Sequence, residues 1–208
     1  MNRRTAIITL VSLIGICKLH AEEEKKTLLV LGDSLTKGYG VLETEAFPAL
    51  LGERLEWKVV NGGVSGDTSA GGLRRLSWLL KSKPDVLIVA LGGNDGLRGI
   101  DPASTEANLR AIIAKARASN PKLKILLTGI DVPKNMGEKY VARFREIFPK
   151  VAKEKGVPLV PDLLEGVSGV AKLNQEDRIH PNALGHKKVA SLVWKHLAQL
   201  VADDKTEK

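Results

Sequence analysis

Short apolar runs alternate with helical patterns along this chain, and this alternation constrains the fold more than any other feature. Each run has the length of a strand and ends at a glycine, a proline or an Asn-Gly pair. The five runs are 27–31, 57–60, 85–91, 123–128 and 157–160. Continuous apolar runs of this length are typical of strands that are buried on both faces of a parallel sheet. We therefore predict a three-layer α/β/α sandwich around a parallel sheet.

Helical patterns fill the gaps between the later runs. Apolar residues recur at helical spacing over 109–116, 140–151 and 189–200. Asp101 and Pro102 predict the start of the first of these helices, because Asp caps helices and proline is tolerated at the first helical position. We interpret the three apolar stripes as core faces rather than as ligand-binding surfaces.

The beginning of the chain has the pattern of a secretory signal. Met1–Arg4 is basic, Thr5–Cys17 is 13 residues without a charge, and Ala21 offers a cleavage position before a polar run. The uncharged stretch is shorter than the roughly 20 residues that a spanning helix needs. We predict that the protein is exported, to the periplasm or the medium, with no stable membrane span after signal removal. An uncleaved anchor or a lipid on Cys17 remains an alternative.

The remaining chain has the length and composition of one domain. The predicted division is a signal over 1–21, a polar linker over 22–26, a domain over 27–201 and a polar tail over 202–208. Cys17 is the one cysteine, so the mature chain would have no disulfide and no cysteine ligand for a metal.

The net charge of +8 comes from basic residues that are scattered among acidic ones. The chain has no block of lysine or arginine and no basic stretch interleaved with aromatic residues, so nucleic acid is not an expected partner. A mildly basic face would still favour the surface of an anionic lipid or polysaccharide.

Four short motifs follow one another in an order that suggests a catalytic site. They are Gly32–Leu35, Ser65–Thr68, Gly92–Asp95 and Asp177–His180. The first three follow predicted strands, and sites in parallel α/β folds form beyond the carboxyl ends of the strands. Together the motifs offer a nucleophile, oxyanion donors and a general base with its carboxylate, which are the parts of a serine hydrolase.

Ser34 is the candidate nucleophile and His180 the candidate base. Asp177 lies three residues before His180, close enough to accept a hydrogen bond from the imidazole. Taken alone, each motif has a simpler interpretation. Ser34 could merely help to cap a helix, and an Asp-x-x-His loop is often an exposed loop without a catalytic role. His186 and His196 fall on the last predicted helix, where we expect polar or half-buried surface residues.

Gly66 and Asn94 are the candidate oxyanion donors. A glycine lets its backbone N–H approach a substrate closely, and an asparagine amide can donate beside it. Alone, Ser65-Gly66 would be read as a turn and Asn94 as a cap at a strand end. The coincidence of four motifs in order favours the catalytic interpretation.

On these four motifs the chain is identified as a member of the SGNH, or GDSL-type, hydrolase superfamily. Longer stretches, such as Leu91–Gly99, resemble the bacterial periplasmic multifunctional esterase group of thioesterase I, lysophospholipase L1 and arylesterases. The resemblance implies a flavodoxin-like fold with five parallel strands and no metal or cofactor. It also implies Ser34 as nucleophile and His180 with Asp177 as base and carboxylate. The implied oxyanion donors are the Ser34 amide, Gly66 and Asn94.

The resemblance further implies which residues border the substrate. These are expected to be Asp33, Leu97, Val132, Pro133 and Ile179. Two places depart from the pattern of the group. The loop 131–137 differs from the usual sequence beside the acyl pocket, and Arg178 stands where a glycine is common. Acyl-chain preference is therefore not carried over, and Arg178 either contacts a polar head of the substrate or points to water.

The predicted function is that of an exported, monomeric serine esterase that works through an acyl-enzyme. Its substrates would be small-molecule or lipid acyl esters: aryl esters, lysophospholipids and acyl thioesters. One alternative is an O-acetyl esterase that acts on carbohydrate. Others are a catalytically inactive envelope-binding protein on the same fold, and a flavin or nucleotide binder.

Overall fold

A computed structural model describes residues 25–202 of the chain, and the predicted signal over 1–21 lies outside the described residues. The described chain forms one five-stranded sheet in which every neighbouring pair of strands is parallel, in the order β2-β1-β3-β4-β5. The strands are β1 (Thr27–Gly32), β2 (Lys58–Gly63), β3 (Val86–Ala90), β4 (Lys124–Thr128) and β5 (Leu159–Val160). The predicted five-stranded parallel sheet is confirmed.

Seven α-helices connect and follow the strands within the described range. They are α1 (Ser34–Lys37), α2 (Phe47–Leu55), α3 (Ser69–Leu79), α4 (Gly93–Leu97), α5 (Pro102–Ser119), α6 (Glu138–Lys155) and α7 (Ala183–Ala202). Short 3₁₀ turns occur at Glu43–Glu45, Leu80–Ser82, Lys134–Met136 and Ala171–Leu173. As predicted, Asp101 caps α5, because its side chain accepts a hydrogen bond from the backbone of Ala103, and Pro102 is the first helical residue.

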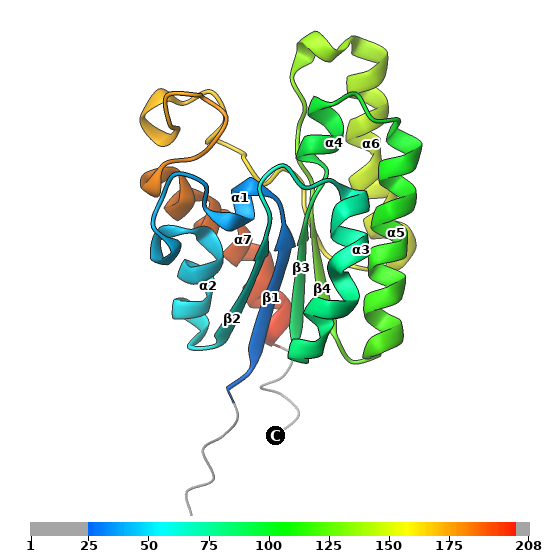
Figure 1. Cartoon of the computed structure of the whole chain (residues 1–208), viewed down its shortest axis with the longest axis vertical. Coiled ribbons are helices and arrows are strands. Elements are labelled where there is room, and N and C mark those ends of the chain that lie inside the picture. The colour runs from blue at the N-terminus through cyan, green and yellow to red at the C-terminus, as the bar shows by residue number, and fades with distance from the viewer. Residues whose placement is uncertain (1–24, 203–208) are drawn as a thin grey trace, which may run out of the picture.

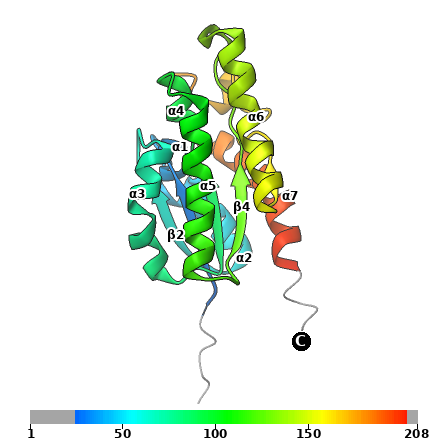
Figure 2. The ribbon, with the colours of Figure 1, turned by 90° about the vertical axis from the view of Figure 1, so that its right-hand side faces the viewer.

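The helices cover both faces of the sheet, which confirms the three-layer sandwich (Figures 1 and 2). Side chains of β1 alternate between two cores: Leu29 and Leu31 pack with α3, α5 and α6, whereas Leu28 and Val30 pack with α2 and α7. All four are fully buried. Burial on both faces is the reason why the strands read as continuous apolar runs in the sequence.

The prediction for one of the two histidines on α7 was wrong. His186 is fully buried rather than on the surface, and its ring lies 6.4 Å from that of Phe47 in a stacked arrangement. Its Nδ1 accepts the backbone N–H of Phe47. Burial lowers the pKa of His186 to about 4, so the ring is neutral and packs as an aromatic residue between α7 and α2. His196 is half-buried, as expected.

The connections place the predicted motifs at one end of the sheet. β1 lies between β2 and β3, and the chain leaves β1 toward one neighbour and reaches the other only later. This reversal of direction is the switch point at which parallel α/β sheets form a crevice. Ser34 follows β1 and Asn94 follows β3, so the two residues lie on either side of that crevice.

Candidate active site

Ser34 is held at the start of a helix by the residues on either side of it. It is the first residue of α1, and the Asp33 side chain caps this helix by accepting the backbone N–H of Leu35 at 2.9 Å. The turn is tight: a Cβ on Gly32 would lie 1.9 Å from the Thr36 hydroxyl. A glycine at position 32 therefore allows β1 to pass directly into α1, which presents Ser34 at the end of the sheet.

His180 and Asp177 form a hydrogen-bonded chain with Ser34. The His180 Nε2 atom lies 2.9 Å from the Ser34 Oγ, and its Nδ1 lies 2.6 Å from the Asp177 Oδ2. The other Asp177 oxygen accepts the backbone N–H groups of Ile179 and His180, each at 2.9 Å. Hydrogen bonds from the backbone and ring of His180, with that from Ile179, lower the pKa of Asp177 to about 2. The carboxylate is therefore ionised and can orient the imidazole.

The loop that carries this pair is fastened from both sides. The Gln175 backbone N–H donates to the His180 carbonyl at 2.8 Å, and its side chain donates to the Tyr39 carbonyl at 2.6 Å. The Tyr39 ring lies 4.7 Å from the His180 ring. Arg178, between the two catalytic candidates, has a left-handed backbone with φ +58. The resulting tight turn lets one carboxylate reach both N–H groups and the ring.

Asn94 contacts a buried carboxylate next to the nucleophile. The Asn94 Nδ2 donates to the Asp33 Oδ2 at 3.2 Å, and Asp33 is 3% exposed. Burial raises the pKa of Asp33 to about 6, against the opposing effect of hydrogen bonds from Leu35 and Asn94. An amide nitrogen has two hydrogens, so Asn94 keeps one for a ligand in the crevice while Asp33 holds the other.

Gly66 adopts a backbone conformation that favours glycine, with φ +77. The guanidinium of Arg98, just after α4, donates to the Gly66 carbonyl at 2.8 Å. This hydrogen bond orients the Gly66 carbonyl toward Arg98 and links the loop after β2 to the helix that carries Asn94.

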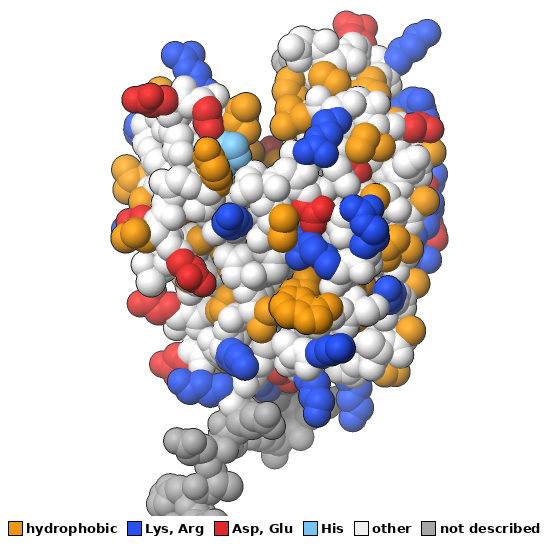
Figure 3. All heavy atoms as spheres, viewed as in Figure 1, with side chains coloured by type: hydrophobic (Ala, Val, Ile, Leu, Met, Phe, Trp, Pro, Cys, Tyr) orange, Lys and Arg blue, Asp and Glu red, His pale blue; other side chains and the backbone are white. Residues whose placement is uncertain are grey.

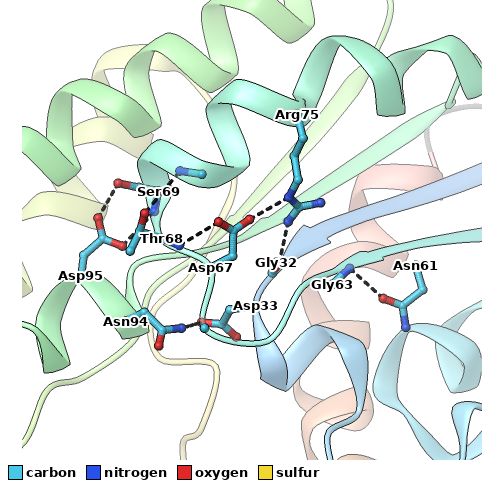
Figure 4. A network of polar contacts seen from close by, with 12 residues as sticks. Gly32, Asp33, Asn61, Gly63, Asp67, Thr68, Ser69, Arg75, Asn94 and Asp95 are labelled. Atoms are coloured by element: carbon cyan, nitrogen blue, oxygen red, sulfur yellow. Dashed lines mark hydrogen bonds and ion pairs between the residues drawn. The ribbon is translucent and has the colours of Figure 1, made fainter.

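Two networks of ion pairs and hydrogen bonds, formed by buried and half-buried residues, hold the loop that contains Gly66 in place (Figure 4). Arg75 on α3 forms an ion pair with Asp67 at 2.7 Å and also donates to the Gly32 carbonyl at 2.8 Å. The loop that contains Gly66 is therefore tied to the end of β1, immediately before the turn to Ser34.

The second network is centred on Asp95, which is 1% exposed. Its carboxylate accepts the backbone N–H of Ser69 at 2.8 Å, the Ser69 hydroxyl at 2.5 Å and the Thr105 hydroxyl at 3.1 Å. Because these residues come from α3, α4 and α5, the carboxylate joins the three elements that flank Gly66 and Asn94. Figure 4 shows its contact with Ser69. Buried carboxylates are stable only when satisfied in this way.

The catalytic candidates line a cleft of about 590 Å³, which we call the active-site cleft. Figure 3 shows that the molecule is hollowed at this end. Ser34, Gly66, Asn94 and His180 all line it, and Asp177 lies behind His180. The five residues expected to border the substrate line it as well: Asp33, Leu97, Val132, Pro133 and Ile179.

The rest of the cleft wall is apolar with a few charges. Further apolar lining comes from Leu35, Ile130 and Leu164. The exposed Arg178 lines the rim, and Arg145 also reaches it but is paired to Asp131 through two contacts of 2.5 Å. An apolar wall beside a nucleophile suits an acyl chain.

Sequence reasoning missed several residues that support this site. No motif marks Tyr39 or Arg75, and Arg98 lies in the stretch Leu91–Gly99 without a role assigned to it. The roles of all three depend on contacts with segments distant in the sequence. Asp95 offered one signal, since it is a carboxylate directly after Asn94, but its burial could not be read from that position.

Within residues 25–202 no cluster of three or more His, Cys, Asp or Glu side chains is placed to hold a metal ion. In the same range no helix is long and apolar enough to cross a lipid bilayer.

Comparison with known proteins points to hydrolases. A model of the GDSL-like Lipase/Acylhydrolase family matches residues 30–188. The chain is 41% identical to an esterase, TesA, of Pseudomonas aeruginosa, over 90% of this chain and 96% of that protein. It is 45% identical to thioesterase 1/protease 1/lysophospholipase L1 of Escherichia coli, over 86% of each chain.

Solved structures agree with these similarities in sequence. The crystal structure of TesA superposes with a TM-score of 0.80 at 43% identity and covers 85% of this chain and 100% of its own. A psychrotrophic esterase, EstA, of Pseudoalteromonas gives a TM-score of 0.78 at 29% identity, over 84% of this chain and 98% of its own.

Proposed function

The chain belongs to the GDSL-like lipase/acylhydrolase family, and on this premise we propose that it is an exported serine esterase that works through an acyl-enzyme. The observation that carries the proposal is the continuous hydrogen-bonded chain from Ser34 through His180 to Asp177 at the wall of the cleft. This is the arrangement that a general base needs to activate a serine hydroxyl.

In the first half of the proposed reaction, the Ser34 Oγ attacks the acyl carbonyl carbon. The hydroxyl proton passes to the Nε2 atom of His180, which lies 2.9 Å away, and the new imidazolium is stabilised by the ionised Asp177. The tetrahedral oxyanion accepts hydrogen bonds from the Ser34 N–H, the Gly66 N–H and the free amide hydrogen of Asn94.

In the second half, His180 returns the proton to the leaving alcohol or thiol, and the acyl group stays on Ser34. Water enters, loses a proton to His180 and attacks the same carbonyl carbon. The bond from this carbon to the Ser34 Oγ then breaks, His180 returns its proton to the Oγ, and the carboxylic acid leaves. Every proton in this cycle is carried by His180, so no metal or cofactor is required.

The apolar wall of the cleft supports medium-length acyl groups as substrates. The name of the Escherichia coli relative supplies two matching substrate classes, lysophospholipids and acyl thioesters, and the family resemblance adds aryl esters. We further propose that residues 1–21 are the export signal of a protein that is periplasmic or secreted and acts as a monomer.

The test compares the full chain with its Ser34→Ala and His180→Ala variants on p-nitrophenyl acetate, butyrate, octanoate and palmitate. We expect kcat to fall by on the order of 10⁴ or more in each variant, with turnover in the wild type rising toward octanoate. Near-wild-type rates in either variant would contradict the mechanism. Serine-dependent turnover confined to acetate would instead indicate a carbohydrate O-acetyl esterase.

A further inference from the structure

The parallel sheet brings a set of lysines together at the end of the molecule opposite the cleft. Exposed lysines precede or open four of the strands. They are Lys25 before β1, Lys58 in β2, Lys81 and Lys83 before β3, and Lys122 before β4. Because all the strands run in one direction, residues that begin them share one edge of the sheet. We call these five residues the basic pole.

Register places the starts of the strands that carry or follow these lysines side by side. Lys58 pairs with Thr27 at the start of β1, and its N–H donates to the carbonyl of Lys26. The start of β4 lies beside Val86 at the start of β3. Figure 3 shows lysine and arginine side chains gathered at the lower end of the molecule, away from the hollow.

The lysines of the basic pole are not held in ion pairs. Within residues 25–202, no carboxylate forms an ion pair with any of the five. Exposed Glu56 and Asp85 at the same end offset part of the charge, and Asp85 also accepts the N–H of Thr27 at 2.7 Å. The five ammonium groups therefore remain available to an anionic partner.

An exposed aromatic residue lies beside this charge. Trp78 is 69% exposed in the last turn of α3, directly before the 3₁₀ turn that contains Lys81. Arg74, one helical turn earlier, is exposed as well. Tryptophan next to basic residues is the combination found where proteins meet the headgroup layer of a bilayer.

The chain outside the described structure also enters at this end. Lys25, the first described residue, belongs to the basic pole, and the sequence before it contains the uncharged stretch 5–17. The uncharged stretch is therefore joined to the protein at the end that carries the basic pole.

We propose that the basic pole and Trp78 form a docking surface for an anionic lipid bilayer, and that docking holds the cleft facing away from it. The strand β1 of six residues separates the two ends by about 20 Å, which leaves the cleft open to the aqueous side. Docked enzyme would therefore act on acyl esters that reach it from solution, rather than on lipids in the bilayer that holds it.

The test measures binding of the full chain to vesicles by sedimentation at low salt. One set of vesicles is pure phosphatidylcholine, and the other holds one part phosphatidylglycerol to two parts phosphatidylcholine. The readout is the ratio of the two binding constants, because the uncharged N-terminal stretch contributes to both. A pole variant carries Lys58→Gln, Lys81→Gln, Lys83→Gln and Lys122→Gln. A control variant with the same charge change carries Lys139→Gln, Lys172→Gln, Lys187→Gln and Lys188→Gln.

We expect the wild type to bind anionic vesicles more tightly than pure phosphatidylcholine vesicles. In the pole variant, the ratio of these two binding constants should fall by on the order of 10²-fold. In the control variant the same ratio should change by less than about threefold. Trp78→Ala should weaken binding to both kinds of vesicle. Added salt should abolish the preference for anionic vesicles. Vesicle-bound wild type should hydrolyse a soluble ester at its free rate.

Three results would overturn the proposal. They are a wild type without preference for anionic vesicles, equal losses in the pole and control variants, and inhibition of soluble-ester turnover on binding, which would mean that the cleft end docks. A fourth result, tighter lysine-dependent binding to duplex DNA than to vesicles, would reject the bilayer as the partner. The binding measurements do not depend on the proposed esterase activity, so they test the docking surface even if the ester assay shows no turnover; only the orientation of the cleft rests on the proposed function.

Discussion

Two aspartates flank the candidate reaction centre, and their environments drive their acidities in opposite directions. Asp33, next to Ser34, is 3% exposed, and burial raises its pKa to about 6. Asp177, behind His180, has a side chain that is 38% exposed and a pKa lowered to about 2. Both are Asp residues within hydrogen-bonding distance of a catalytic candidate, so residue type alone does not assign their roles.

The difference comes from the number of donors and from access to water. Asp177 accepts two backbone N–H groups and an imidazole at the surface, which favours its charged form. Asp33 accepts one backbone N–H and one amide at the buried end of β1, which leaves its desolvation incompletely offset. A carboxylate that stays ionised suits the stabilisation of an imidazolium, whereas a buried one suits the orientation of a neutral amide.

The sharpest test of this comparison replaces Asp177 by asparagine. An amide keeps the shape of the side chain but loses the charge that stabilises protonated His180, and it can stabilise the wrong tautomer. We expect Asp177→Asn to lower kcat on p-nitrophenyl butyrate by about 10³ to 10⁴. The free energy of unfolding, measured in urea, serves as the control for folding. A loss below tenfold would remove Asp177 from the catalytic set.

The next test removes the amide that Asp33 holds. Asn94→Ala should lower kcat by roughly 10² to 10³ with little change in KM, because an oxyanion donor acts in the transition state. Steady-state kinetics on the same ester measures both constants. If kcat fell by less than about threefold, Asn94 would have a structural role only.

A third test replaces Asp33 by asparagine and measures two quantities, kcat and the free energy of unfolding. Asp33→Asn should lower kcat about tenfold, because the Asn94 amide loses a charge-assisted partner. The pKa of Asp33 lies near 6 in the folded protein and near 3.8 when exposed, so the folded state binds this proton more tightly. The bound proton therefore adds its full contribution to the free energy of unfolding below pH 3.8, and this contribution is lost as the pH rises through 6.

The Asp33→Asn variant lacks this loss, so its free energy of unfolding relative to the wild type should rise between pH 4 and pH 7. The rise should amount to about 1 to 3 kcal/mol. Urea unfolding at intervals of pH measures it, and contributions from other groups cancel in the difference. A difference independent of pH would show that Asp33 is not the group that titrates.

The smallest effect is expected from Arg178, which lies between Asp177 and His180 in the sequence. Arg178→Gly relieves a left-handed backbone at φ +58 but adds freedom to the unfolded chain, so the free energy of unfolding should change by less than about 1 kcal/mol. On uncharged esters kcat should stay within about twofold. A loss above tenfold would mean that Arg178 contributes to the reaction itself.

Much of the fold was predictable because parallel strands buried on both faces leave a plain apolar signal. The helix after Asp101 was predictable for a similarly local reason, since its cap and proline are adjacent in the sequence. His186 was misjudged because its polar type outweighed its position, three residues before the buried Val189 on the same helical stripe. Spacing was the better guide there.

The sequence by itself determined the five strands, the three later helices, their order and the four motifs, because helix caps, apolar periodicity and turn glycines act between residues that are close in the chain. The family resemblance added the five cleft residues. Only the tertiary structure decided that His180 contacts Ser34, 146 positions away, that Arg75 and Asp95 support the loop that contains Gly66, and that two aspartates differ in acidity. Those properties depend on burial and on donors contributed by distant segments, and neither quantity exists until the chain has folded.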